Sequence, residues 1–393
     1  MISRRHFLNR SAIVSLAPWL PAFLPGSVSA TATSNEKILV VIQLSGGNDG
    51  LNTVVPFADE LYARQRKDLR IPTDRVLKLN NQVGLHPSMR SAMDLFQDGR
   101  LTVVQGVGYP NPNRSHFESM SIWHHARLES DGHDGHGWLG RAADARTMAT
   151  DTDSYWIGSG EIPQALLGRR ANAIALENES DLSLTEPSAA TSAPDTSSAN
   201  IESFVSRTIH QSFAAARSLD SRMTTQQSAT YPSTELGRQM RLASRLIKLD
   251  GDARVYYVSQ SGYDTHSGQL PTHAQLLREF SDALKAFLED MRDAKLDERI
   301  VVLVFSEFGR RVQENGSSGT DHGAAGPVFL AGKQVAGGLV GEQPSLTDLD
   351  DGDLKMDIDF RRVYATLLDA WLGIDSKLVL GASFEPMALL ANR

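Results

Sequence analysis

Short runs of apolar and β-branched residues alternate along this chain with longer segments of helical periodicity. The short runs are typical of buried strands. They span residues 37–44, 101–105, 173–176, 254–259, 299–305 and 327–331. Strands that alternate with helices usually form one mostly parallel sheet with helices packed on both faces. The sequence therefore predicts an α/β protein with three layers, α/β/α, around a mostly parallel central sheet.

Apolar spacing near 3.6 residues predicts the helices between these strands. The predicted helices span residues 86–97, 115–127, 201–223, 233–249, 270–291 and 360–371. Residues 181–200, DLSLTEPSAATSAPDTSSAN, are rich in Ser, Thr, Ala and Pro, and such a composition cannot bury a core. We expect a disordered loop there, which opens a helical insertion at about 180–250 within a single domain of residues 31–393.

Residues 1–30 have the layout of an export signal. Arg4 and Arg5 stand before an apolar run, a pattern typical of the twin-arginine pathway, and Val28 and Ala30 supply the small residues of a cleavage site after Ala30. The alternative is an uncleaved anchor, but the run is shorter than the ~20 residues of a spanning helix. The sequence predicts a periplasmic or extracellular protein that uses the twin-arginine translocase and has no stable membrane span.

Charge and cysteine content narrow the classes of partner. The formal net charge is −8, and loss of the three arginines in residues 1–30 would make it −11. An acidic surface argues against nucleic acid or an anionic membrane as the main partner. The chain has no cysteine, so a metal would be held by His, Asp, Glu or neutral oxygen atoms.

Polar clusters follow the predicted strands. In an open parallel sheet, ligands bind outside the carboxyl ends of the strands. The clusters are SGGNDG, SGYDTHSGQ, SEFGRR and SSGTDHGAAGP. Their carboxylates and imidazoles suit a divalent cation. The candidate metal ligands are Asp49, Asp264, His266, Glu307, Asp321 and His322.

Simpler interpretations of these residues stay open. Asp49 can form an Asx turn or cap a helix. A dinucleotide-binding loop is disfavoured because Ser45 stands where that fingerprint has its first glycine. Glu307 can pair with Arg310 or Arg311, as a lone carboxylate often does.

The segment PNRSHFESM supplies candidates for catalysis. Ser115, with Glu118 three residues later, matches a capping box. It also places a hydroxyl at a helix N-terminus, where backbone N–H groups favour anions. The adjacent His116 is a candidate ligand, proton donor or structural residue. The His-rich stretch 124–138 is interpreted as an exposed loop rather than as a second metal site.

Several longer motifs give the chain a resemblance to a known family. They are GGNDGLNTVVP, VGLHPSM, PNRSHFESMSIW, GWLGR, SGYDTH, VFSEFGRR, GTDHGAAGPVFLAG and DFRRVYATLLDAWLG. The sequence resembles the exported bacterial family called domain of unknown function 1501. That family is grouped with the alkaline phosphatase and sulfatase superfamily, whose members hold metal at strand ends and attack phosphate or sulfate esters with Ser, Thr or a modified Cys.

The resemblance implies roles for individual residues. Asp49 resembles the metal aspartate after the first strand, and Ser115 resembles the nucleophile at a helix start. The pair Asp264 and His266, together with His322, resembles the metal ligands of later strands.

At one point the chain departs from the superfamily pattern. Glu307 and Phe308 stand where the superfamily has an Asp-His pair. Phenylalanine cannot bind a metal, so a second ion would need His116, His86 or Asp321.

The resemblance predicts an exported metal-dependent hydrolase of phosphate or sulfate esters. Its catalytic candidates are Ser115, His116 and Arg310, with Arg310 or Arg114 binding the nonbridging oxygens. The predicted cofactor is a divalent metal, with Zn as the first choice and Mg, Mn or Ca as alternatives. The substrate would be a small anionic ester or an envelope polymer. Competing hypotheses are a non-catalytic metal-binding envelope protein of the same fold and an exported oxidoreductase.

Overall fold

The computed structural model describes residues 36–128, 134–146, 152–178, 229–249 and 253–391. These residues belong to one compact unit. The predicted export signal, the loop at 181–200 and the helix at 201–223 lie outside the described residues.

The described residues include a nine-stranded sheet whose order is β11-β5-β10-β9-β1-β8-β6-β7, with β14 beside β5. All neighbouring strands are parallel except β10, which runs antiparallel to β5 and β9. The strands are β1 (Ile38–Leu44), β5 (Leu101–Gly108), β6 (Ser154–Ile157), β7 (Ala173–Leu176), β8 (Val255–Gln260), β9 (Ile300–Phe305), β10 (Gly326–Ala331), β11 (Gly338–Val340) and β14 (Ile358–Asp359). The mostly parallel sheet and its six predicted strands are confirmed.

The central strand β1 explains why the apolar runs are continuous rather than alternating. It pairs in parallel with β8 on one side, where Leu39 lies opposite Val255, and with β9 on the other, where Leu39 lies opposite Val301. Every residue of β1 is buried. Both of its faces lie under helices, so both faces must be apolar.

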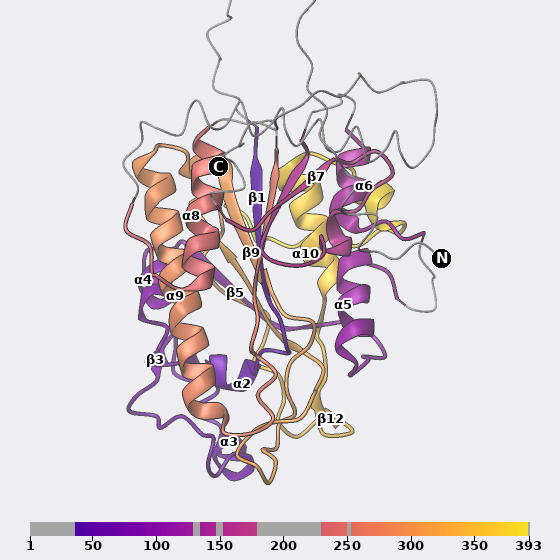
Figure 1. Ribbon diagram of the computed structural model, residues 1–393. Coiled ribbons are helices and arrows are strands. Elements are labelled where there is room, and N and C mark those ends of the chain that lie inside the picture. The colour runs from indigo at the N-terminus through magenta and orange to yellow at the C-terminus, as the bar shows by residue number, and fades with distance from the viewer. Residues whose placement is uncertain (1–35, 129–133, 147–151, 179–228, 250–252, 392–393) are drawn as a thin grey trace, which may run out of the picture. The chain divides into compact units, whose positions relative to one another are not determined.

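Helices cover the sheet on two sides, as Figure 1 shows. One layer contains α4 (Arg90–Gln97), α8 (Glu235–Lys248) and α9 (Gln269–Asp293), and the other contains α5 (His116–His125), α6 (Trp138–Asp144) and α10 (Phe360–Thr366). Helix α8 packs on α9 and β8. It therefore belongs to a covering layer, although the sequence analysis placed it at the end of the insertion.

The second layer is held to the sheet by stacked aromatic rings. Trp123 of α5 stacks on Phe305 of β9 and on Phe360 of α10. Trp138 of α6 stacks on Tyr364 of α10 with ring centroids 4.0 Å apart. Burial of several such large side chains stabilises this layer and fixes the position at which α5 begins.

Short elements make up the connections. Figure 1 shows α2, α3 and β12 beyond the end of the sheet at which β1 finishes. The short elements are α2 (Gly50–Thr53), β2 (Val54–Val55), α3 (Glu60–Gln65), β3 (Leu77–Lys78), β4 (Gly84–Leu85), a 3₁₀ helix (Gln164–Leu166), another (Asp297–Arg299), β12 (Leu349–Asp350), β13 (Asp353–Leu354), a π-helix (Leu367–Leu372) and α11 (Ser376–Leu380). No helix of the described residues is long and apolar enough to cross a membrane.

The strand directions decide which loops meet. The carboxyl ends of β1, β5, β8 and β9 lie at one edge because these strands run the same way. β10 runs the opposite way, so the loop before it reaches that same edge. Residues after four strands and before a fifth are therefore brought together.

Candidate metal centre

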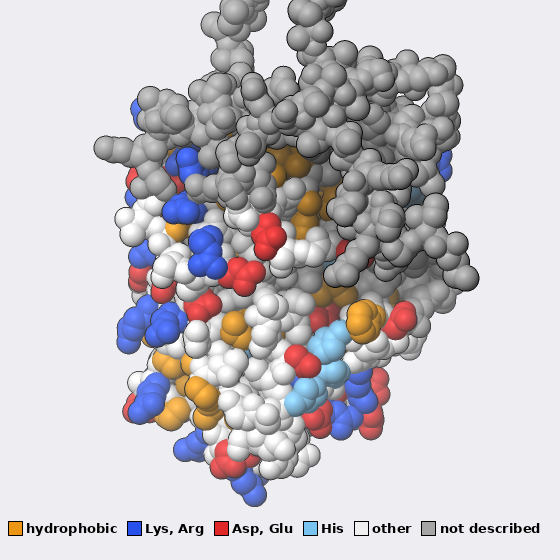
Figure 2. All heavy atoms as spheres, in the orientation of Figure 1, with side chains coloured by type: hydrophobic (Ala, Val, Ile, Leu, Met, Phe, Trp, Pro, Cys, Tyr) orange, Lys and Arg blue, Asp and Glu red, His pale blue; other side chains and the backbone are white. Residues whose placement is uncertain are grey.

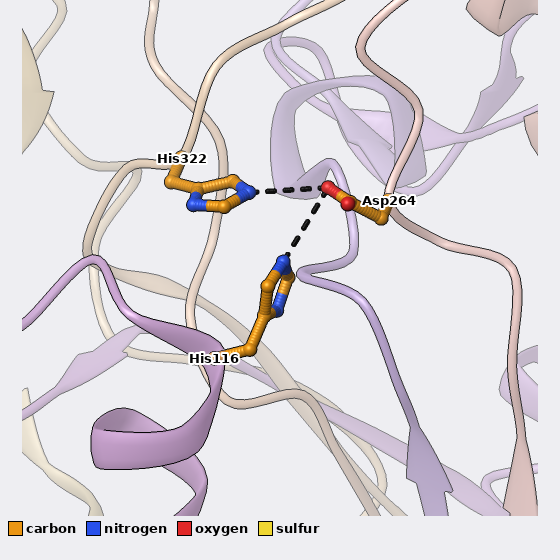
Figure 3. Close-up of side chains that lie close together, drawn as sticks. All are labelled: His116, Asp264 and His322. Atoms are coloured by element: carbon orange, nitrogen blue, oxygen red, sulfur yellow. Dashed lines mark hydrogen bonds and ion pairs between the residues drawn. The ribbon is translucent and has the colours of Figure 1, made fainter.

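Side chains from three separate segments meet at one carboxylate oxygen, Oδ1 of Asp264. The distances to this oxygen are 3.0 Å from His266 Nε2, 3.1 Å from His322 Nε2 and 3.5 Å from His116 Nε2. The ligand atoms of His116, Asp264 and His322 all lie within 4.8 Å of one another. Figure 3 shows the rings of His116 and His322 both pointing a nitrogen at Asp264. The sequence analysis named all four residues, with His116 as a catalytic candidate.

The fold explains how these residues reach one point. His116 is the first residue of α5, which follows β5, and Asp264 and His266 follow β8. His322 precedes the antiparallel strand β10. The side chains of Asp264 and His266 are 48% and 43% exposed, so the cluster is open to solvent. Figure 2 shows histidine side chains gathered on one face, with acidic side chains beside them.

Each of the three histidines is oriented by a hydrogen bond from its other ring nitrogen, Nδ1. Carboxylate and carbonyl oxygens accept, so Nδ1 carries the proton and Nε2 presents its lone pair to the cluster. The pairs are His116 with Glu307 Oε1 (2.8 Å), His266 with Asp321 Oδ1 (3.3 Å) and His322 with the backbone oxygen of Arg114 (2.7 Å). In metal sites, a histidine ligand typically donates its second ring N–H to a carboxylate or carbonyl oxygen of this kind.

This arrangement leaves lone pairs that face one another. His266 Nε2 and His322 Nε2 are 2.9 Å apart, and both lie near the Asp264 oxygen. His116 Nε2 is buried and has no hydrogen-bond partner among the described residues. Converging lone pairs repel unless a proton or a cation lies between them. The donor set therefore fits a divalent metal ion.

The pKa shifts of Asp264 and His322 favour the protonation states that bind a metal. Burial raises the pKa of Asp264, but the hydrogen bond and the positive charge of Arg310 outweigh it and lower that pKa to about 2. Burial also lowers the pKa of His322. At neutral pH Asp264 is thus a carboxylate and His322 a neutral imidazole. The hydrogen bond to Glu307 raises the pKa of His116 against the opposing effect of burial.

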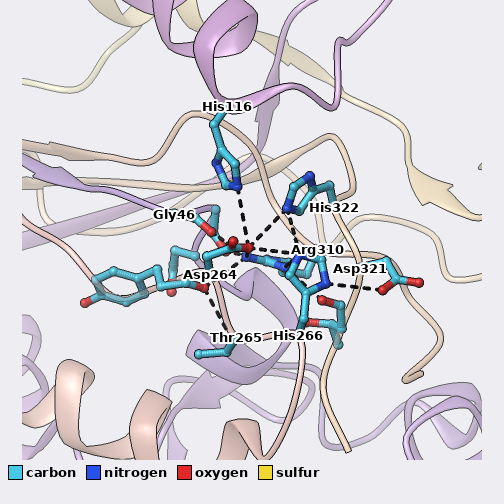
Figure 4. A network of polar contacts seen from close by, with 12 residues as sticks. Gly46, His116, Asp264, Thr265, His266, Arg310, Asp321 and His322 are labelled. Carbon is cyan, nitrogen blue, oxygen red and sulfur yellow. Dashed lines mark hydrogen bonds and ion pairs between the residues drawn. The ribbon is translucent and has the colours of Figure 1, made fainter. Parts of the chain in front are cut away.

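Arg310 supports Asp264 from the protein side. Its buried guanidinium donates to Asp264 Oδ1 at 2.7 Å and to the carbonyl oxygens of Gly47, Thr320 and Tyr263, with a further bond to Gly46 O. Figure 4 shows Arg310 beside Asp264, with His266 turned toward Asp321. The remaining N–H of Arg310 Nη1 points to His266 Nε2 at 3.5 Å, so all of its N–H groups have partners within the fold. Arg310 therefore positions Asp264, and it has no donor left for the ester oxygens that the sequence analysis assigned to it.

Glu307 and Phe308 have different roles beside the cluster. Glu307 accepts from His116 Nδ1 and from the backbone N–H of Gly46, both at 2.8 Å. The ring of Phe308 lies 4.9 Å from that of His116 and 4.8 Å from that of His322. An apolar ring without a ligand atom thus packs against two of the histidines of the cluster.

Asp49 is also placed at a strand end, but in a different environment. It is fully buried, and its carboxylate binds Arg66 and Gln269 and caps α2 by accepting from Asn52 N. Burial opposes ionisation, but Arg66 and other donors hold the pKa of Asp49 below its usual value. The alternative interpretation of Asp49 as a helix cap describes this geometry, so we leave Asp49 out of the proposed ligand set.

Ser115 is the N-cap residue of α5, as predicted, but the predicted capping box is wrong. Its side chain makes no capping hydrogen bond, and its own backbone N–H donates to Asn113 Oδ1 at 2.8 Å. Ser115 is exposed, with its hydroxyl at the start of the helix that carries His116. The Asn113 side chain supplies the hydrogen-bond acceptor in the turn before the helix, and the Ser115 hydroxyl is not used for capping.

The remaining candidates lie apart from this set of contacts. Arg114 pairs with Asp351 and Asp353. His86 is buried, and burial lowers its pKa to about 4. His124, which was expected in an exposed loop, is buried near the end of α5, where Nε2 lies 3.1 Å from Gln43 Oε1. That expectation is wrong for His124 because helix α5 continues through it.

The sequence analysis missed two supports of the cluster. One is the Arg114 backbone oxygen, which orients His322, and the other is the Asn315 side chain, which donates to Asp321 at 3.1 Å. A backbone carbonyl carries no sequence signal, so only the fold could identify the first. The motif ENGSSGTDH does contain Asn315, and an amide in a turn before a carboxylate is a weak signal for the second.

The fold and the cluster define an α/β/α protein with a candidate metal centre at the carboxyl edge of its sheet. A family model described as a protein of unknown function (DUF1501) matches residues 36–382, and the chain belongs to this family. No curated protein matches the chain.

Solved structures that resemble the chain are distant in sequence. One is a protein of the alkaline phosphatase superfamily from Vibrio parahaemolyticus, with 10% identity, a TM-score of 0.44, and coverage of 88% of this chain and 69% of that one. Another is the PsFucS1 sulfatase from Pseudoalteromonas sp., with 10% identity, a TM-score of 0.44, and coverage of 90% and 71%. A third is the C-terminal periplasmic domain of EcEptC from Escherichia coli, in a complex with Zn, with 11% identity, a TM-score of 0.37, and coverage of 77% and 75%.

Proposed function

We propose that this protein is an exported, metal-dependent hydrolase of phosphate or sulfate esters. The observation that supports this most strongly is the convergence of three Nε2 atoms and one carboxylate oxygen on a solvent-exposed point, with every Nδ1 held from behind. Such preorganisation costs stability unless the cluster binds something. The exposure of the cluster supports a site that meets a substrate.

The proposed metal ligands are His116, Asp264 and His322, with His266 beside them. Imidazole nitrogens with one carboxylate suit Zn²⁺ better than Mg²⁺ or Ca²⁺, which prefer oxygen ligands. We therefore propose one zinc ion. When bound, a cation of this kind supplies Lewis-acid stabilisation of the charge that develops on an ester oxygen.

Ser115 is the proposed nucleophile. It is exposed, its hydroxyl makes no capping bond, and it precedes His116 at the N-terminus of α5. Unpaired N–H groups of a helix start favour an anionic group there. A phosphate or sulfate ester at this position would lie beside both the serine hydroxyl and the metal ligand His116.

Metal analysis and turnover assays on variants test the proposal. Purified protein is expected to contain about one zinc per chain and to hydrolyse at least one member of a panel of aryl phosphates, phosphodiesters and aryl sulfates. Ser115→Ala should abolish turnover and keep the metal, while Ser121→Ala on the same helix should keep both. Unchanged turnover in Ser115→Ala would remove Ser115 from the nucleophile role.

A second candidate is a metal-binding envelope protein without catalysis. It is favoured by the four donors around one point, because a filled tetrahedral set is typical of structural zinc. Phe308, in place of a second ligand pair, also favours it. Zinc-loaded wild type that turned over no ester in the panel would support this candidate. Visible absorbance from a flavin would instead support an exported oxidoreductase.

The proposed periplasmic or extracellular location rests on residues 1–30. Replacement of Arg4 and Arg5 by Lys should leave the precursor in the cytoplasm, because the twin-arginine receptor reads that pair. Normal accumulation outside the cytoplasm would contradict this route.

A further inference from the structure

A cavity of about 230 Å³ lies at the same edge of the sheet as the cluster. Its wall is mainly apolar. The apolar lining residues are Tyr109, Pro110, Pro112, Ala325, Leu354 and Met356. A concave, mostly apolar pocket beside a few polar groups is the usual form of a small-molecule site.

The cavity and the metal cluster share parts of the chain. Glu307, which accepts from His116 Nδ1, is one of the lining residues. The wall formed by residues 109–112 continues within a few residues to His116. Ala324 and Ala325, also in the wall, stand between His322 and β10, with Gly323 separating them from His322. Glu307 therefore joins the cavity wall to the cluster, and the two lie next to each other.

The buried polar groups of the wall, on Tyr109 and Glu307, are already engaged. The Tyr109 hydroxyl lies 2.9 Å from Ser119 Oγ and accepts from Asn113 N at 3.0 Å. Glu307 accepts from Gly46 N and Ser306 Oγ as well as from histidine. The wall thus has few free groups for the many hydroxyls of a sugar, whose burial without partners would be unfavourable.

The size of the cavity sets the size of its occupant. A dry cavity of about 150 Å³ lined by apolar side chains can hold benzene. The cavity beside Glu307 is larger, at about 230 Å³, so it has room for a substituted aromatic ring or a branched aliphatic group. The other polar lining residues, Asn111, Asp350 and Lys355, are exposed.

We infer that this cavity binds the organic group of the ester, and that this group is apolar. The inference rests on the proposed function and deepens it: the substrate is the phosphate or sulfate ester of a phenol or an apolar alcohol, held with its anionic end at the cluster and its apolar end against Tyr109 and Met356.

Direct binding separates this inference from the proposed catalysis. The probe is neutral 4-methylumbelliferone, measured by its fluorescence with the full-length protein. Ala324→Leu adds apolar volume to the wall and should weaken binding of the probe about tenfold, a usual effect of a few methylenes in an apolar pocket. Leu378→Ala, at an exposed apolar residue that does not line the cavity, is the matched control and should bind like wild type.

Kinetics supply the second measurement. In wild type, kcat/KM for phenyl or methylumbelliferyl esters should exceed that for sugar esters of the same anion, and Ala324→Leu should remove most of this preference while the zinc content stays unchanged. Probe binding without turnover of any ester would overturn the proposed function but would still support an apolar binding site in the cavity. Turnover without a preference for apolar esters, or equal probe binding by wild type and Ala324→Leu, would overturn the inference.

Discussion

Asp264 and Asp49 both follow a strand of the same sheet, and the structure gives them opposite environments. Asp264 is 48% exposed and is faced by three imidazole nitrogens with their lone pairs inward. Asp49 is 0% exposed and is faced by the guanidinium of Arg66, which has no lone pair to offer. Both carboxylates also pair with a buried arginine, Asp264 with Arg310 and Asp49 with Arg66, but only Asp264 faces imidazole lone pairs and solvent in addition.

The difference shows what makes a strand-end carboxylate a ligand. Position at the carboxyl edge is shared by both aspartates, so position alone does not decide. The other partners decide: both aspartates bind an arginine, but only Asp264 is also surrounded by imidazole lone pairs, and these favour a cation between them. The predictions below test this comparison, from the largest expected effect to the smallest.

Removal of the charge should lower stability by different amounts at the two aspartates. Asp49→Asn should lower the free energy of unfolding by about 3–5 kcal/mol, because it leaves the buried Arg66 without its partner. Asp264→Asn should cost the metal-free protein only about 1 kcal/mol, because Asp264 is 48% exposed and its buried partner Arg310 keeps its bonds to backbone carbonyl oxygens. Urea titration gives both values.

Metal content completes this test. Asp49→Asn should retain zinc when folded, and Asp264→Asn should lose it. Zinc retained by Asp264→Asn, or lost by a folded Asp49→Asn, would reverse the roles assigned to the two residues.

Chelation should destabilise the protein through the cluster alone. With free zinc at about 100 times its dissociation constant, bound metal contributes about 2.7 kcal/mol to folding. A chelator at neutral pH should therefore lower the Tm of wild type and leave that of His322→Ala unchanged. At acid pH, protonated ligands release the metal, and the chelator should have little effect. If the chelator left the Tm of wild type unchanged at neutral pH, that result would contradict the metal centre.

Buried histidines outside the cluster should govern stability between about pH 6.5 and pH 4. Burial lowers the pKa of His124 to about 3, of His273 to about 3 and of His86 to about 4. Below about pH 6.5 the unfolded histidines bind protons and the folded ones stay neutral, so the free energy of unfolding falls as pH falls. Each such histidine contributes a slope of about 1.4 kcal/mol per pH unit.

Replacement of one of these histidines measures its own contribution to the pH dependence of the free energy of unfolding. In metal-free protein, His124→Gln should reduce the slope by about 1.4 kcal/mol per pH unit between about pH 6 and pH 4.5. His116, whose pKa is raised, contributes with the opposite sign, since its stabilisation is lost as pH rises through its folded pKa. The difference between wild type and His124→Gln cancels that contribution. Parallel slopes would mean that His124 is protonated in the folded state.

Ser115→Ala should have the smallest effect on stability. Side-chain caps are usually worth about 1 kcal/mol, but Ser115 makes no capping bond, so the change should cost only about 0.3 kcal/mol. Thermal or urea unfolding of metal-free protein measures this. A loss of about 1 kcal/mol or more would show that the hydroxyl caps α5 in solution.

The sequence predicted the sheet well because buried strands leave a local pattern. The sequence of strand β1 is a continuous apolar run because both of its faces are covered, and the sequences of β8 and β9 show a similar pattern. The short strands β6, β11 and β14 were missed because two to four residues carry little usable period. The helical layer that contains α9 was predicted because 25 residues give several turns of apolar spacing.

The candidate site was predicted less completely. His266, Asp264 and His322 were named as ligands because they stand beside strands, and nothing in their spacing distinguished them from Asp49. The partner of Asp49 is Arg66, 17 residues later in a segment without a distinctive motif. Whether a carboxylate meets an arginine or an imidazole depends on such distant contacts.

The sequence by itself determined the order of strands and helices, the export signal pattern and the set of polar residues at the strand ends, because each depends on residues close together in the chain. The tertiary structure alone decided which of those residues face one another. It brought His116 to Asp264 across the sheet, turned β10 so that His322 reached the same edge, and supplied the Arg114 carbonyl that fixes its ring. Pairing of charges and lone pairs acts through space over a few ångströms, so it is set by the fold and not by position along the chain.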